Sequence, residues 1–456
     1  MTQPDARIGL CFLFPYTYAM ADIGLIPIAM AGVMAGAILA LVPGLHVYNI
    51  VGIAIILAAH GSLTFSGEVM AMAMIGLVVG WSTLNVIPAV FLFAPDDASA
   101  FVVAPAAKHL LRGAGMQAVL LIGAGSLSAL LCLVLVSPIL DEMLRPLRAI
   151  LQPHFGWILT AICGFLILGE WPRGNDLAPT PVRRLLSAWA WLGAGLLTFG
   201  LSGILGFVLL YRSPIALEAA FANLLPAFVG LFTVPSLIQT LFFGRQPPLQ
   251  RIGHFDLPPG LLLRGTLTGV AGGLFAGFLP VISGGIGGLL AGHASAQHDE
   301  RVFMISQGAS KVAYYAGSLL LLFVPGLTLT RGGMAWMLST LYVPYGWRLY
   351  GLAVAAIAFG GVLAFGLLIV LSRAAAWLSP RINVQALATV ALIISCGITA
   401  GFTGLAGLGI LAVAAAIGLI PIFVGGRRMD CLGVLLAPMT LNFIGVAPEV
   451  ARWLGL

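Results

Sequence analysis

Charged residues are scarce in this chain: Asp, Glu, Lys and Arg make up only 8% of its 456 residues, whereas hydrophobic residues make up 60%. A soluble domain carries about a quarter of charged residues, so this composition excludes a protein with a water-solvated surface. The apolar runs are long and do not alternate with polar residues, which excludes a transmembrane β-barrel. The sequence therefore predicts an all-α polytopic membrane protein.

Basic clusters and paired cysteines are also lacking. The formal net charge of +6 is spread over loops, as at 183–184 and 427–428, and provides no dense basic face for nucleic acid. Positive charge on loops is typical of the cytoplasmic side of a membrane protein. The five cysteines stand singly, without metal-ligand spacing. We therefore predict no nucleic-acid partner, no metal site and no cofactor other than a coupling ion.

Two sets of apolar segments occur in the same order. Residues 1–243 and 260–456 each contain several segments long enough to cross a bilayer, and a polar linker at 244–259 joins them. Each set includes a segment broken by proline and glycine, at 43–60 and at 280–297. The pattern predicts two structural repeats with about 12 transmembrane spans and a re-entrant or discontinuous helix in each. It is compatible with parallel or inverted repeats.

The paired breaks indicate a function. Hydrocarbon offers no hydrogen-bond partners, so backbone freed by a break must be buried in protein or face a water-filled cavity. Interrupted segments at matching positions of two halves are typical of a secondary transporter's binding site. We therefore predict a permease in which one part of each repeat moves against the rest and exposes the site to each side in turn.

The first break contains Pro43, Gly44, Leu45 and His46, with Asn49 one turn further on. A helix that restarts here would point its positive end at an anion. His46 and Asn49 are three positions apart, so they can share a helix face and bind a carboxylate. The alternative is an ordinary loop at a helix end, with His46 in the headgroup region.

The second break contains Pro280, Ser283, Gly284 and Gly285. Backbone N–H groups and the Ser283 hydroxyl can bind anionic oxygens in such a segment. The lysine and the following Ser/Thr of a phosphate-binding P-loop are missing, so nucleotide hydrolysis is not predicted. The alternative is close helix packing through small residues.

Three charged residues are further candidates. Lys311 lies well inside an apolar helix, where a cation is costly, and we predict that it is the counter-charge of an anionic substrate. The alternatives are snorkelling or an internal pair with Glu300 or Asp299. Asp96 and Asp97 close an apolar run, so they either bind a coupling Na⁺ or H⁺ or cap the next helix.

Several of these motifs resemble a known family. The sequence has LVPGLH at 41–46, IPAVFLFAPD at 87–96, GFLP at 277–280, SGG at 283–285 and DERVF at 299–303. Together they resemble the large membrane subunit of tripartite tricarboxylate transporters, in a divergent branch of the TctA-like permeases.

The resemblance implies a permease of the cell inner membrane that moves a di- or tricarboxylate, with the two breaks as its site. It also implies two partners, a small membrane subunit and a periplasmic binding protein. The chain departs from the family at Val281, where glycine is usual, and at 307–311, where a different motif is usual.

Two other functions are considered. A lipid-linked anion such as a polyprenyl phosphate would also suit a site lined by backbone amides. An enzyme acting on lipid headgroups is less favoured and would require Asp96, Asp97 and His109 to cluster with His293 or His298 around a metal. We expect that the protein is not an enzyme.

Overall fold

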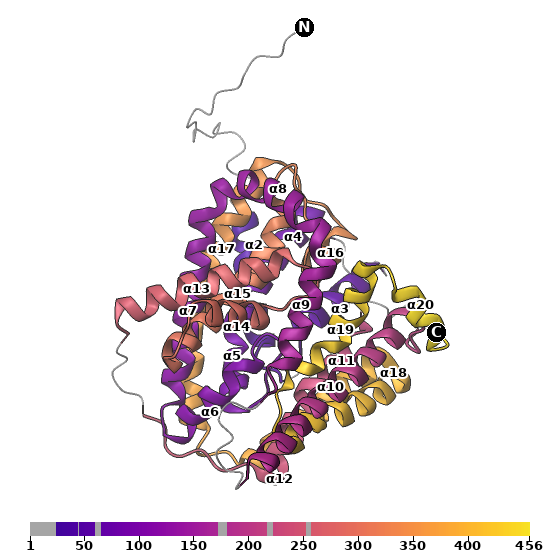
Figure 1. Ribbon diagram of the computed structural model, residues 1–456. Coiled ribbons are helices and arrows are strands. Elements are labelled where there is room, and N and C mark those ends of the chain that lie inside the picture. The colour runs from indigo at the N-terminus through magenta and orange to yellow at the C-terminus, as the bar shows by residue number, and fades with distance from the viewer. Residues whose placement is uncertain (1–23, 44, 60–64, 172–179, 217–221, 252–256) are drawn as a thin grey trace.

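The computed structural model describes residues 24–43, 45–59, 65–171, 180–216, 222–251 and 257–456. Every regular element in this part of the chain is a helix, which confirms the predicted all-α class. The helices form two groups that lie side by side in Figure 1.

The first group, at the left in Figure 1, surrounds both interrupted helices. Its long members are α2 (Leu25–Leu39), α4 (Gly67–Leu84), α7 (Gly115–Val136), α13 (Pro259–Phe278), α15 (Glu300–Phe323) and α17 (Gly346–Leu378). Shorter elements join them: α3 (Val47–Ala59), α5 (Val86–Phe91), η1 (Ala100–Val102), α6 (Val103–Leu111), η2 (Ser137–Ile139), α8 (Leu140–Leu151), η3 (Gln152–His154), α14 (Gly284–Ala294) and α16 (Gly333–Ser339).

The second group, at the lower right in Figure 1, is built mainly from the later part of each half. It contains α9 (Phe155–Leu168), α10 (Pro181–Tyr211), α11 (Leu225–Phe228), the π-turn η5 (Val229–Thr233), α12 (Val234–Phe243), α18 (Val384–Val424), η6 (Arg428–Leu432), α19 (Gly433–Ile444) and α20 (Ala447–Trp453).

Small residues set the closest helix pairs. A Cβ atom on Gly76 of α4 would lie 1.8 Å from the carbonyl oxygen of Ala29 in α2. A Cβ atom on Gly273 of α13 would lie 2.4 Å from the carbonyl oxygen of Ser310 in α15. Only glycine allows these approaches, and small residues commonly bring helices together in membranes, where apolar side chains gain little by leaving lipid.

Both predicted breaks are interruptions between helices. Helix α2 ends at Leu39 and the chain becomes helical again at Val47, while α13 ends at Phe278 and α14 begins at Gly284. In the second break Val281 has a φ of 54°, in the left-handed region that β-branched residues rarely adopt. Glycine, which the resemblance implies at this position, would adopt such a φ without strain.

The helices make this a multi-pass membrane protein. In the described part of the chain, seven helical stretches are long and apolar enough to cross a bilayer, or eight if the bent pair at Arg428–Ile444 and Ala447–Trp453 is one span. One stretch, Gly115–Leu168, contains α7, α8 and α9, and α18 is kinked at Gly404. Helix α2 has only 15 residues, so the predicted count of about 12 spans stays a prediction.

The predicted linker, 244–259, has no helix or strand at 244–251 or at 257–258, and α13 already begins at Pro259; residues 252–256 lie outside the described chain. The Gln246 amide donates hydrogen bonds to the carbonyls of Ser379 and Ile382, between α17 and α18. The linker therefore packs against the connection between α17 and α18, in the middle of the second half.

Candidate functional site

The two breaks line one cavity of about 330 Å³. Its lining includes His46, Tyr48 and Asn49 from the first break and the start of α3, and Pro280, Val281 and Ser283 from the second break. The cavity therefore lies where the sequence predicted that the two interrupted helices form a site.

Two hydrogen-bonding groups at this cavity lack partners. The Asn49 side chain, in the first turn of α3, is only 4% exposed, and Ser283, the N-cap of α14, is 3% exposed. Neither the Asn49 amide nitrogen nor the Ser283 hydroxyl has a hydrogen-bond partner among the described residues. Buried donors are normally paired, and both lie at the positive end of a helix, so the arrangement suits an anion.

The backbone of the first break is held by side chains from other helices. The Trp81 indole N–H donates a hydrogen bond of 3.0 Å to the carbonyl of Leu45. The Ser395 hydroxyl of α18 donates one of 3.2 Å to the carbonyl of Pro43. Carbonyls freed by the break are therefore satisfied within the protein, as a membrane environment requires. Gly44 lies outside the described residues.

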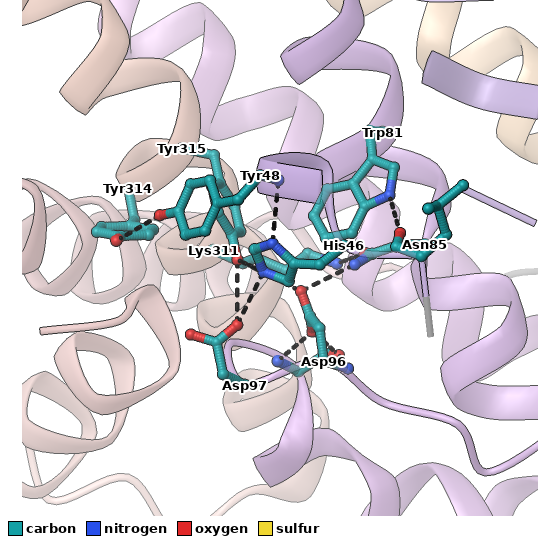
Figure 2. Close-up of polar contacts among 11 residues, drawn as sticks. His46, Tyr48, Trp81, Asn85, Asp96, Asp97, Lys311, Tyr314 and Tyr315 are labelled. Carbon is teal, nitrogen blue, oxygen red and sulfur yellow. Dashed lines mark hydrogen bonds and ion pairs between the residues drawn. The ribbon is translucent and has the colours of Figure 1, made fainter. Parts of the chain in front are cut away.

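His46 is at the centre of a buried hydrogen-bond network (Figure 2). Its Nε2 lies 3.1 Å from the Asp97 carboxylate and 2.9 Å from the Tyr315 hydroxyl. The backbone N–H of Tyr48 donates to Nδ1 at 3.2 Å. An N–H group is only a donor, so Nδ1 is the acceptor and Nε2 carries the proton in this arrangement.

Asp96 caps the turn that follows it, one of the two roles that the sequence left open, while its role at a coupling ion stays a prediction. Its Oδ1 accepts a hydrogen bond of 2.7 Å from the Ser99 backbone N–H, a local cap of the turn before η1. Its Oδ2 accepts one of 2.9 Å from the amide of Asn85. One carboxylate oxygen therefore stabilises the chain's turn and the other belongs to the network around His46.

Lys311 reaches this network and not the cavity. Its ammonium donates to the Asn85 carbonyl oxygen, its residue is 2% exposed, and it is absent from the cavity lining. Glu300 and Asp299, its alternative partners, instead pair with Lys108 and Arg301. The role of Lys311 as the substrate's counter-charge stays a prediction.

The charges of the network do not balance. We call His46, Asn85, Asp96, Asp97, Lys311 and Tyr315 the buried polar cluster. With His46 neutral and Lys311 protonated, two carboxylates face one cation, which leaves a net charge of −1. One ligand atom each from His46, Asp96 and Asp97 lie within 4.8 Å of one another. Nε2 of His46 carries a proton in this arrangement, so the two carboxylates are the groups that can hold a cation.

Gly284 and Gly285 serve close packing. A Cβ atom on Gly284 would lie 2.8 Å from the Cα of Lys311, and one on Gly285 would lie 2.7 Å from the carbonyl oxygen of Ala98. The Ser310 hydroxyl donates a hydrogen bond of 2.6 Å to the Gly284 carbonyl. These glycines seat α14 against α15 and the segment after Asp97, and neither is in the cavity lining.

Arg331 is a cavity residue that the sequence analysis missed. It lies in the loop between α15 and α16, with its guanidinium 5.2 Å from the centre of the Phe155 ring. An arginine in a loop is an ordinary feature of a membrane protein, so the sequence carried no signal that would have identified it.

The metal cluster required for an enzyme does not form among the described residues. The metal-capable group contains His46 and not His109, His293 or His298. The ring nitrogens of His109 and His293 instead bond the carbonyls of Pro105 and Leu289, within their own helices.

Two interrupted helices that enclose a cavity within a multi-pass bundle are the architecture of a membrane transporter. Residues 26–433 match the Tripartite tricarboxylate transporter TctA family, and the chain belongs to this family. The predicted resemblance is thereby confirmed, and membership makes the protein a permease of the tricarboxylate transporter class.

A relative from an archaeon is similar over much of the chain. The uncharacterized protein MJ1079 of Methanocaldococcus jannaschii is 28% identical over 309 residues, which cover 67% of this chain and 70% of that protein. No solved structure matches the chain.

Proposed function

We propose that the protein is a secondary permease of the cell inner membrane that moves a di- or tricarboxylate-like anion together with a monovalent cation. One observation carries the proposal: the unpartnered donors of Asn49 and Ser283 line a single cavity with His46, at the starts of α3 and α14. A carboxylate would pair both donors and benefit from both helix ends.

Coupling follows from the negative charge beside this cavity. Asp97 lines the same cavity as the unpartnered donors, so its carboxylate repels an incoming anion. A Na⁺ or H⁺ bound at Asp96 and Asp97, beside His46, would cancel the net charge of −1 in the buried polar cluster. Cation binding would then favour anion binding, as coupled transport requires.

The packing of the helices supports two repeats. Helix α7 of the first half packs on α15 of the second, and α17 of the second packs on α4 of the first. In the same way α10 packs on α19, and α18 packs on α12. Each half thus gives the other the same kinds of contact, as expected for duplicated units with about 12 crossings.

Alternating access would come from movement of the two groups of helices against each other. The cavity lies between them, since His46 of the first group stacks on Phe228 of the second, with ring centres 5.8 Å apart. A shift of one group would open this contact and expose the cavity to one side.

The family's tripartite character extends the proposal to partners. We expect a periplasmic binding protein that delivers the anion and a small membrane subunit beside the permease. Co-purification of the chain with these two subunits, when all are expressed together, tests this part.

A soluble anion suits the cavity better than a lipid phosphate. A groove between α10 and α18, of about 760 Å³, is lined by apolar residues and would suit a polyprenyl chain. The groove and the cavity at the breaks have no lining residue in common. A lipid whose chain lies in the groove therefore has no shared residue at which its phosphate would enter the cavity.

Thermal stabilisation of the purified protein tests the function. Citrate, succinate, phosphate and a polyprenyl phosphate are compared in sodium and in potassium, and in each case at two pH values. We expect a saturable shift with a carboxylate that is reduced in Ser283→Ala. Ser372→Ala is the control, because Ser372 is fully buried in α17 and its hydroxyl bonds within its own helix. A shift with the lipid phosphate alone would overturn the substrate.

A further inference from the structure

Arg331, a residue with a fixed positive charge, is among the residues that line the cavity, and its role goes beyond the binding site described so far. We infer that Arg331 binds a second anionic group of the substrate, so that the cavity favours small anions with two or more carboxylates over monocarboxylates. The inference rests on the proposed function, since it assigns a residue to selectivity at the same cavity.

Arg331 has no competing counter-charge. Among the described residues, no carboxylate lies within ion-pairing distance of its guanidinium, which packs on the Phe155 ring. Burial lowers the pKa of Arg331, and the nearby Arg148 lowers it further. Both effects disfavour the charged guanidinium, but an arginine stays protonated in a protein. An anion bound beside Arg331 would offset these two costs and would therefore be stabilised.

The cavity offers one site for each end of a small dianion. Its charged and titratable lining residues are His46, Tyr48, Asp97, Tyr314 and Arg331. Asp97 belongs to the buried polar cluster, which leaves Arg331 as the lining residue with a permanent positive charge. A volume of about 330 Å³ is at the small end for ligand sites, which suits a short dicarboxylate, and Arg331 and Ser283 both belong to the lining.

Lys311 has a different role in this scheme. Its ammonium is hydrogen-bonded to Asn85 and lies outside the cavity lining. Lys311 therefore compensates the carboxylates of the buried polar cluster, while Arg331 remains free for the substrate. In this scheme Arg331 takes the role of counter-charge to the substrate, which was predicted for Lys311.

Calorimetric binding to the full-length protein in sodium tests the inference, with acetate, succinate and citrate as probes. We expect Arg331→Gln to weaken succinate and citrate binding by about 10- to 100-fold, the range for hydrogen bonds to charged groups. Acetate binding should change by less than about threefold, because one carboxylate needs only the donors of Asn49 and Ser283. Arg148→Gln is the control and should leave all three affinities unchanged.

Two further variants make the outcome decisive. Arg331→Lys keeps a cation over Phe155 and should lose part of the succinate affinity, since lysine cannot form a bidentate contact; it decides the question if Arg331→Gln does not fold. Ser283→Ala should weaken all three anions alike.

The failures can be told apart. Unchanged succinate binding in both Arg331 variants, or an equal loss for acetate and succinate, would overturn the role of Arg331 and leave the proposed function standing. If the wild-type protein binds none of the three anions, the proposed function fails, and this inference fails with it.

Discussion

Removing the positive charge of Lys311 is the sharpest test of the buried polar cluster. In Lys311→Met the ammonium that donates to Asn85 is lost, while the length of the side chain is largely kept. The carboxylates of Asp96 and Asp97 then face no compensating lysine, and the net charge of the cluster changes from −1 to −2.

The magnitude follows from burial. Lys311 is 2% exposed and Asp97 is 6% exposed, so water screens their interaction little. The printed partner of the ammonium is the Asn85 carbonyl oxygen, and a hydrogen bond made by a charged group contributes about 1.5–3 kcal/mol. We expect Lys311→Met to lower the free energy of unfolding by this amount, measured by denaturant titration in detergent.

A double substitution separates charge from packing. Adding Asp96→Asn to Lys311→Met returns the net charge to −1 and should recover at least half of the lost free energy. Lys108→Met is the matched control, because its pair with Glu300 is exposed and such surface pairs contribute about 0–1 kcal/mol. A second consequence is that Na⁺ should stabilise Lys311→Met more than the wild-type protein.

Losses of stability that add up in the double variant would refute this reasoning. If Asp96→Asn destabilises Lys311→Met further, or if Lys108→Met costs as much as Lys311→Met, then the lysine does not stabilise the carboxylates through its charge. Its loss would in that case be one of packing alone.

Three further predictions concern other parts of the molecule. Asp97→Asn removes the charge that repels the anion, so carboxylate binding should become independent of sodium. Titration of the carboxylate in sodium and in potassium measures this, and an unchanged sodium dependence would contradict the coupling scheme. Trp81→Phe loses the hydrogen bond to Leu45, which should cost about 1–3 kcal/mol of stability and weaken anion binding, because a buried carbonyl is left unpaired. Burial raises the pKa of Glu170 from 4.5, although the Arg427 backbone N–H opposes the shift. The folded state therefore binds this proton more tightly than the unfolded state, so stability falls as the pH rises from about 4.5 through the raised pKa, and Glu170→Gln should flatten that part of the curve; identical pH profiles would refute it.

Local and compositional features could be predicted because their physical causes are local. The scarcity of charge excludes a water-solvated surface whatever the order of the helices. A proline followed closely by glycine disfavours the continuation of a helix, so the breaks before Val47 and Gly284 could be located. The short motifs around these breaks were also sufficient to suggest the family that residues 26–433 match.

Contacts between distant residues required the tertiary structure. His46 meets Asp97 across 51 positions and Tyr315 across 269, and no local rule connects them. The sequence could state the cost of burying Lys311 but not its partner, which proved to be Asn85. Only the packing of the helices decides which side chains share a cavity.

Composition and the interrupted helices thus determined a helical membrane protein with two breaks, because the bilayer restricts backbone and charge along every segment of the chain. The tertiary structure alone decided that the breaks share a cavity, that two carboxylates face one lysine, and that Arg331 joins Asn49 and Ser283 at the lining. These facts depend on how helices far apart in the chain pack together, and packing is set by the shapes of all the helices at once.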